Sequence, residues 1–122
     1  MKDLPPEAQN MLSQLQQLQQ QLQSVMSQKR RAEAYQQEAE EALEEVQNAG
    51  EDVPMYKAAG NVLVKTDREK LVNELEEKKE TYGLRVKTLD RQENKLREKL
   101  EELQNKLQNM FSTGFGQSGT GQ

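Results

Sequence analysis

The sequence contains no cysteine, no histidine and no tryptophan among its 122 residues. The absence of cysteine excludes disulfides and thiolate nucleophiles, and the absence of histidine removes the usual zinc ligand and neutral-pH proton carrier. There is also no glycine-rich phosphate loop. We therefore expect no catalytic residue, no cofactor and no metal site, and an enzyme is the least favoured interpretation. The lack of cysteine also favours a reducing cytoplasm.

Apolar residues make up only 33% of the chain and aromatic residues 4%. A globular domain of this length is normally about half apolar, so a conventional compact core is excluded. The longest uncharged stretch, residues 8–28, is rich in glutamine, which a bilayer rejects. We therefore expect no membrane span. The folded structure must be stabilised by a narrow seam of apolar side chains in place of a broad core.

The formal net charge is −4, and residues 67–110 carry as many acidic as basic side chains. Phosphate binding requires an excess of lysine and arginine on one face. Nucleic acid is therefore not an expected partner.

Apolar residues recur at alternating spacings of three and four residues in two long stretches of the chain. This is the pattern of the buried seam of a coiled coil, and it predicts two long helices of roughly 60 Å each. The predicted seam positions of the first helix are Leu4, Ala8, Met11, Leu15, Leu18, Leu22, Val25, Lys29, Ala32, Gln36, Ala39, Leu43 and Val46. Those of the second are Val72, Leu75, Lys79, Tyr82, Val86, Leu89, Glu93, Leu96, Leu100, Leu103, Leu107 and Met110.

The ends of these helices carry local signals. Pro5 and Pro6 fit the first turn of a helix, and Gly50 is typical of a left-handed C-terminal cap. Thr66 to Glu69 has the pattern of a capping box that starts the second helix. We expect a coiled-coil helix over 1–50, a hairpin over 51–66, a second coiled-coil helix over 67–110, and a disordered glycine-rich tail over 111–122.

Residues 55–58 and 62–66 have strand character around a Gly60-Asn61 turn. An isolated two-stranded hairpin is marginally stable in water, so we expect it to pair with hairpins of other chains. The residues predicted to carry this assembly are Tyr56, Ala58, Gly60, Val62, Leu63 and Val64. The predicted fold class is mainly α: a long antiparallel two-helix coiled coil, joined by a β-hairpin that assembles with other subunits into a barrel.

A short connection predicts antiparallel seams, with Val46 opposite Val72 and Gln36 opposite Tyr82. A slip of one heptad would match the apolar positions equally well. Lys29, Gln36, Lys79 and Glu93 interrupt the seam, either as long side chains that reach out to solvent or as residues that fix the register. Tyr35 lies off the predicted seam and receives no role.

Apolar side chains also concentrate where the start of the first helix meets the end of the second. They either close the coil and fray there, or offer an adaptable binding surface, for which methionine is well suited. The uncharged glutamine-rich stretch is likewise either a plain solvent face or a face that repels no partner. We define the tip set as Leu4, Ala8, Met11, Leu12, Leu107, Met110, Phe111 and Phe115.

The chain resembles the prefoldin family, and within it the archaeal β-type subunits. The resemblance rests on the glutamine-rich stretch 14–23, on VPMYKAAGNVLVK at 53–65, and on LRVKTLDRQE at 84–93. It covers about residues 4–110, and the Tyr-Lys-x-x-Gly-Asn core is its specific part. Tyr82-Gly83 departs from the expected family pattern of leucine and a helix former.

The resemblance implies a hexamer of two α-type and four β-type subunits, built as a double β-barrel with six projecting coiled coils. It implies an ATP-independent holdase that captures non-native polypeptides at the coil tips and delivers them to a group II chaperonin. By analogy, polypeptide contacts fall on the tip set and barrel contacts on residues 56–66.

Two other interpretations remain open from the residues alone. One is a structural spacer or tether with a single defined partner. The other is a parallel two-chain coil with a small β head, as in a nucleotide-exchange cochaperone, although Gly60-Asn61 favours a tight reversal.

Overall fold

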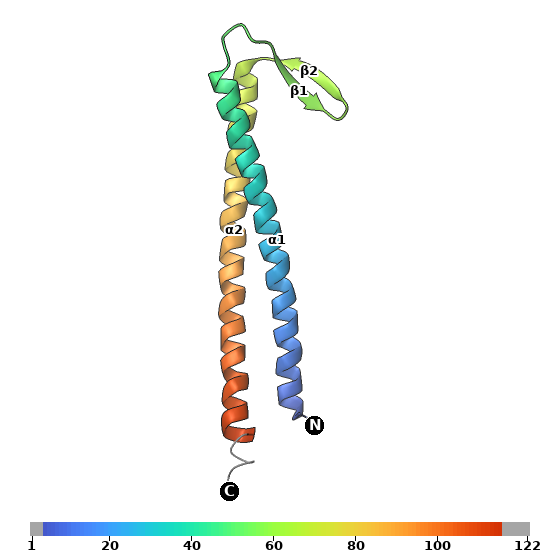
Figure 1. Cartoon of the computed structure of the whole chain (residues 1–122), viewed down its shortest axis with the longest axis vertical. Helices are drawn as coiled ribbons and strands as arrows, with labels where there is room; N and C mark the ends of the chain where they lie inside the picture. Colours follow the sequence, from blue (N-terminus) through green and yellow to red (C-terminus); the bar gives the residue numbers. More distant parts are fainter. Residues whose placement is uncertain (1–3, 116–122) are drawn as a thin grey trace. The chain divides into compact units, whose positions relative to one another are not determined.

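The computed structural model describes residues 4–115. Helix α1 (Pro6–Asn48) leads into strands β1 (Met55–Ala59) and β2 (Val62–Thr66), then helix α2 (Arg68–Asn109) and a π-helix η1 (Met110–Phe115), as Figure 1 shows. This order is the predicted helix, hairpin and helix. The chain forms two compact units, described separately below. The hairpin unit comprises residues 28–88, and the terminal unit comprises residues 4–27 and 89–115.

Helix α1 begins as predicted, with a proline in its first turn. The Gln9 N–H donates to the Pro5 carbonyl oxygen at 3.0 Å, which makes Pro6 the first helical residue. At that position no backbone N–H is needed and the fixed φ of proline already suits the helix.

The predicted end of α1 is wrong in one respect, because Gly50 does not adopt the left-handed conformation. The helix ends at Asn48, and its last carbonyl groups are met by a side chain from α2. The Arg68 guanidinium donates to the carbonyl oxygens of Val46 at 2.7 Å, Gln47 at 3.4 Å and Gly50 at 2.5 Å. In many helices a glycine in the left-handed conformation lets the backbone bond the last carbonyl groups. Here the Arg68 guanidinium binds these carbonyl groups instead.

Helix α2 is capped one residue later than the predicted capping box. The Lys70 N–H donates to Asp67 Oδ1 at 2.9 Å, and the Leu71 N–H donates to the Asp67 carbonyl oxygen at 3.1 Å. Asp67 is therefore the N-cap in place of Thr66. Thr66 instead ends β2, where it pairs with Met55.

Strands β1 and β2 are antiparallel, with Ala59 paired to Val62 across a two-residue turn. Gly60 has a φ of 63°, whereas every other described residue, including Asn61, has a negative φ. Positive φ at the first turn position alone is the pattern of a type II′ turn, which matches the twist of the flanking strands. The predicted Gly60-Asn61 reversal is confirmed.

The seam of the hairpin unit follows the predicted positions. Ala32, Ala39 and Leu43 of α1 are buried there, whereas Lys79 is the one predicted seam position of this unit that is exposed. Long lysine side chains commonly reach out of such an interface.

The register of the hairpin unit agrees with the prediction to within one residue. The ring centroids of Tyr35 and Tyr82 lie 5.1 Å apart, and a Cβ atom at Gly83 would lie 2.8 Å from the Gln36 Nε2 atom. A slip of one heptad would separate both pairs, so it is excluded in this unit. Tyr35, which the sequence left without a role, packs against the seam residue Tyr82.

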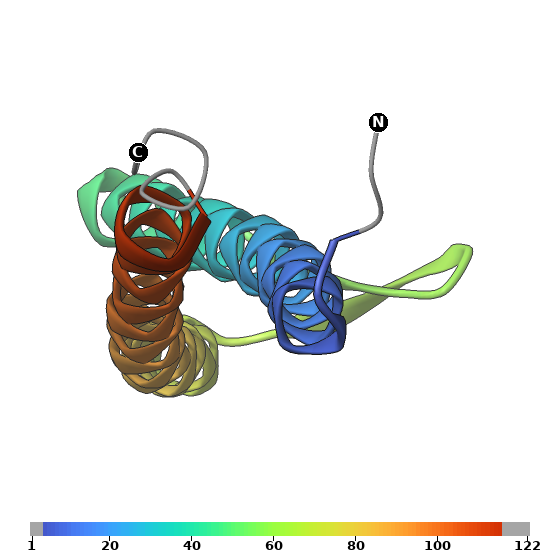
Figure 2. The ribbon, with the colours of Figure 1, turned by 90° about the horizontal axis from the view of Figure 1, so that it is seen from below.

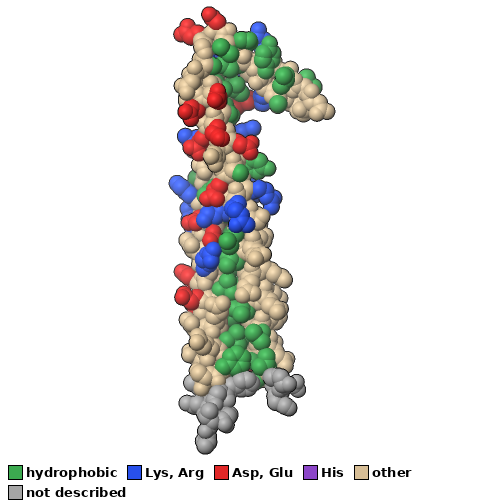
Figure 3. All heavy atoms as spheres, viewed as in Figure 1, with side chains coloured by type: hydrophobic (Ala, Val, Ile, Leu, Met, Phe, Trp, Pro, Cys, Tyr) green, Lys and Arg blue, Asp and Glu red, His purple; other side chains and the backbone are tan. Residues whose placement is uncertain are grey.

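The terminal unit has its own seam, in which Ala8 of α1 and Leu89, Leu100 and Leu103 of α2 are buried. The space-filling view shows the hydrophobic side chains as a narrow band between broad polar flanks (Figure 3). Glu93 interrupts this seam and forms an ion pair with Arg97 at 2.8 Å. Arg97 also reaches across to the Met26 sulfur, 3.5 Å away.

The tail predicted to begin at residue 111 is described only as far as residue 115. Residues Met110–Phe115 continue from α2 as a π-helix, and residues 116–122 lie outside the described part of the chain. No helix among residues 4–115 is both long and apolar enough to cross a membrane.

Candidate functional site

The hairpin exposes most of its apolar side chains. We define the hairpin surface as Tyr56, Ala58, Val62, Leu63 and Val64, all of which are exposed. Leu63 is 69% exposed and Val62 is 61% exposed. Because side chains alternate along a strand, Tyr56, Ala58 and Leu63 share one face of the hairpin, whereas Val62 and Val64 lie on the other. Both faces of the hairpin therefore present apolar groups to solvent.

The hairpin is attached to its own helices at few points. Met55, at the start of β1, is buried, and the Lys57 ammonium lies 2.8 Å from a Glu74 carboxylate oxygen. Both partners of this ion pair are about half exposed, and such surface pairs contribute only about 0–1 kcal/mol. Seen end-on in Figure 2, the hairpin projects to one side of the helices of its unit.

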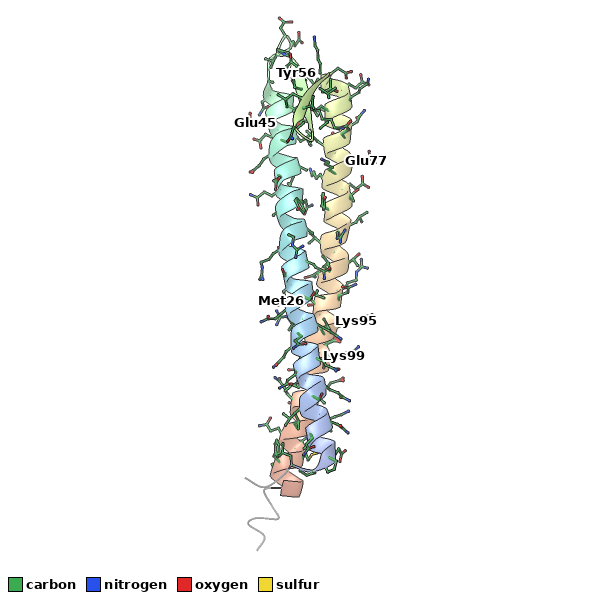
Figure 4. The ribbon with its side chains drawn as sticks, turned by 90° about the vertical axis from the view of Figure 1, so that its right-hand side faces the viewer. Met26, Glu45, Tyr56, Glu77, Lys95 and Lys99 are labelled. Carbon is green, nitrogen blue, oxygen red and sulfur yellow. The ribbon has the colours of Figure 1, made fainter. Side chains whose placement is uncertain are left out.

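The sheet has two strands, and no third strand lies against either of its edges within residues 4–115. Edge strands with free N–H and C=O groups are templates for pairing with another chain. A two-stranded hairpin also needs more strands, or a covered apolar face, for independent stability. The hairpin surface, including Tyr56 as labelled in Figure 4, therefore has the features of an interface that is incomplete in the single chain.

The tip set divides by burial. Ala8 is 0% exposed and Leu107 is 6% exposed, so both belong to the seam and neither offers surface to a partner in this conformation. Each fills the space between the helices of the terminal unit, and their assignment as contact residues stays a prediction. The half-buried members are Leu4, Met11, Leu12, Met110 and Phe111. The Phe115 side chain lies outside the described part of the chain.

A shallow groove of about 320 Å³ lies beside the seam of the terminal unit. The polar side of the groove is formed by Gln14, Gln17 and Gln21 of α1 facing Lys99, Glu102 and Lys106 of α2, and Leu18 and Leu103 also contribute to its lining. The helix α1 contributes no charged side chain to this groove. Sequence reasoning identified the glutamine-rich stretch but not its pairing with these residues of α2.

Two further side chains were missed by sequence reasoning. Arg68 holds the end of α1, and no local pattern marks an arginine for contacts 18 to 22 residues away. Leu84 is 59% exposed on α2, outside the predicted seam. Among residues 4–115, no three or more carboxylate, histidine or cysteine side chains gather closely enough to hold a metal ion.

Comparison with known proteins places these features in a family. A family model described as "Prefoldin subunit" matches residues 9–114. A prefoldin subunit beta of Archaeoglobus fulgidus is 54% identical over 116 residues, which cover 95% of this chain and 100% of that protein. The prefoldin subunit beta of Methanocella arvoryzae is 50% identical over 117 residues, covering 96% of this chain and 93% of that one.

Solved structures agree with the sequence relatives. The crystal structure of the prefoldin beta subunit from Thermococcus strain KS-1 matches with a TM-score of 0.82 and 45% identity, over 89% of this chain and 96% of that chain. The beta2 subunit of the same strain, at 20% identity and a TM-score of 0.68, shares the fold. With the helix–hairpin–helix order and the Tyr-Lys-x-x-Gly-Asn hairpin, these matches show that the chain belongs to the prefoldin family as a subunit of the β type, with the chaperone-type role of that family.

Proposed function

We propose that the chain is one of several subunits of an ATP-independent holdase, which assembles through its hairpins and captures non-native polypeptides. The assembly is a hexamer of two α-type and four β-type subunits whose hairpins join into β-barrels. The observation that carries this proposal is the hairpin surface, where residues 4–115 leave apolar side chains on both faces and two sheet edges uncovered.

The terminal unit of each subunit supplies the contacts to the non-native polypeptide. Met11 and Met110 are half-buried, and an unbranched, polarizable side chain adapts to partners of different shape. Each such contact is weak, but several subunits in one assembly raise the local concentration of binding sites around one polypeptide. Avidity then replaces affinity, and release to a group II chaperonin requires only competition by a second binder.

The uncharged α1 side of the groove fits the same role. Its glutamine side chains offer donors and acceptors to an extended backbone, and helix α1 adds no charge that would repel an acidic or a basic polypeptide. This supports the interpretation that the glutamine-rich stretch is kept neutral for varied partners.

The proposal is tested with the full chain assembled with a prefoldin α-type subunit. Deletion of residues 111–122 combined with Leu4→Ser and Met110→Ser is expected to abolish suppression of aggregation of a denatured protein, because three of the five half-buried apolar side chains of the tip set are lost. Native mass spectrometry is expected to show an unchanged number of subunits in the assembly, at a mass lowered by the deleted residues. The matched control combines Leu84→Ser with deletion of residues 116–122, and it is expected to suppress aggregation like the unmodified chain.

Full suppression by the tip variant would reject the terminal unit as the capture site. A structural tether, the competing function, predicts that even the unmodified assembly leaves aggregation unchanged and binds one defined partner.

A further inference from the structure

The two ends of the hairpin segment are joined by one side chain. Arg68 is the first residue of α2 and directly follows the cap of that helix, whereas its guanidinium lies at the end of α1. One of its terminal nitrogens donates to the carbonyl oxygens of Val46 and Gln47, and the other donates to that of Gly50. Gly50 lies before β1 and Arg68 lies after β2, so these bonds close the base of the hairpin.

The chemistry of this contact favours arginine over every other side chain. Hydrogen bonds from an ionised donor are roughly twice as strong as neutral ones. The carbonyl end of a helix also carries partial negative charge that attracts a cation. A planar guanidinium presents several donors in fixed directions and can serve three acceptors at once, whereas a lysine ammonium is a compact, strongly hydrated point charge.

Apart from the one-residue connection between β2 and α2, few other contacts hold the hairpin in place. Within the hairpin unit, the strands are otherwise attached through the buried Met55 and the half-exposed Lys57–Glu74 ion pair. The connection between α1 and β1 contains one backbone turn bond, from the Val53 N–H to the Gly50 carbonyl oxygen at 3.2 Å. That bond shares its acceptor with Arg68, so the guanidinium also fixes the turn that leads into β1.

We propose that Arg68 is a positioning residue for assembly. It ties the base of the hairpin to the end of α1 and thereby fixes the direction in which the strands leave the helices. The free sheet edges are then presented at one angle, which lowers the conformational entropy that is lost when subunits join. The effect on assembly rests on the function proposed above, whereas the effect on hairpin direction concerns the single chain alone.

The absence of cysteine allows a direct measurement of hairpin direction. Asn61→Cys at the turn and Glu80→Cys on α2 are both exposed positions of the hairpin unit that accept spin labels. Pulsed electron paramagnetic resonance on the isolated chain is expected to give a narrow distance distribution. Arg68→Ala is expected to broaden it, with Arg68→Lys intermediate. Lys70→Ala, which removes an exposed cation in the same turn of α2, is expected to leave it unchanged.

The same substitutions are then made without the labels and mixed with a prefoldin α-type subunit. Arg68→Ala is expected to weaken assembly by about tenfold or more, the loss that follows from removing a charged hydrogen-bond donor. Circular dichroism on each variant checks that the helices persist. If Arg68→Ala loses its helices, the effect on assembly is judged from Arg68→Lys.

An unchanged distance distribution in the Arg68 variants would overturn the proposal whatever the assembly does. A broadened distribution with unweakened assembly would refute the link from hairpin direction to subunit joining. Failure of the unmodified chain to assemble would reject the proposed function, while the distance measurement would still decide whether Arg68 positions the hairpin.

Discussion

Gly60 shows how one residue sets the geometry of the hairpin. Its φ of 63° lies in the left-handed region, and a Cβ atom there would meet nothing within 4 Å. Any cost of a side chain at this position therefore comes from the backbone alone. Left-handed backbone costs an L-residue about 1–2 kcal/mol.

Gly60→Ala is accordingly expected to destabilise the assembled protein by about 1–2 kcal/mol per chain. Urea denaturation at a fixed chain concentration measures the change. Gly50→Ala is the matched control, because Gly50 has no positive φ and its added Cβ would make an ordinary contact, 3.7 Å from a Val53 methyl carbon. Equal losses for the two variants would show that left-handed strain is not the cause.

Tyr35 and Gln36 illustrate what residue-by-residue reasoning can and cannot reach. Heptad spacing placed Gln36 in the seam and opposite Tyr82, and the structure has Gln36 against the neighbouring Gly83. The contact of Tyr35 with Tyr82 was not predicted. A side chain beside the seam packs against the facing helix only when that helix carries a large ring at the same level. Such pairing depends on two distant segments and leaves no local signal.

At the scale of elements, the helices and strands were predictable because their signals are local. Heptad spacing, prolines in a first turn and a Gly-Asn reversal each act within a few residues. The ends were less predictable. The end of α1 is completed by Arg68 from another element, and the choice between Thr66 and Asp67 as cap depends on where strand pairing stops.

The cap of α2 gives a prediction at this scale. Asp67→Ala removes the acceptor of the Lys70 N–H and is expected to destabilise the protein by about 0.5–2 kcal/mol. Thr66→Val keeps the branched shape at the end of β2 and is expected to have a smaller effect, because the Thr66 hydroxyl does not cap the helix. Thermal denaturation followed by circular dichroism compares the two variants. A larger loss for Thr66→Val would restore the capping box predicted from the sequence.

At the scale of the whole molecule, assembly through hairpins makes stability depend on chain concentration. Association that stabilises the folded state raises Tm as concentration rises. Leu63→Lys places a charge on the hairpin surface and is expected to abolish this dependence while the helical signal persists. The measurement is a set of melting curves of the chain, mixed with its α-type partner, over a range of concentrations.

Leu84→Lys provides the control for this experiment. Leu84 is exposed to a similar degree as Leu63 but lies on α2, away from the strands. Its variant is expected to keep the concentration dependence. If both lysine variants behaved alike, general surface polarity and not the hairpin would govern association.

The two candidate surfaces differed in how far sequence could predict them. The exposure of the hairpin surface was predictable, because a chain with so few apolar residues has little with which to cover a strand pair. The role of this surface in assembly stays a prediction. For the tip set, burial was predictable only in part, and contact with a partner stays a prediction. Heptad spacing identifies apolar residues along a seam without separating those that face the partner helix, such as Ala8 and Leu107, from those at its margin.

The hydrogen-bond acceptors of Arg68 are all backbone carbonyl oxygens. Every amino acid supplies the same carbonyl oxygen, so positions 46, 47 and 50 are free to change identity without disturbing the tie. Position 68 has no such freedom, since its reach and its donors are those of one side chain. The chemical requirement at this junction thus falls on the side chain of residue 68 alone, because its acceptors are backbone atoms that no substitution removes.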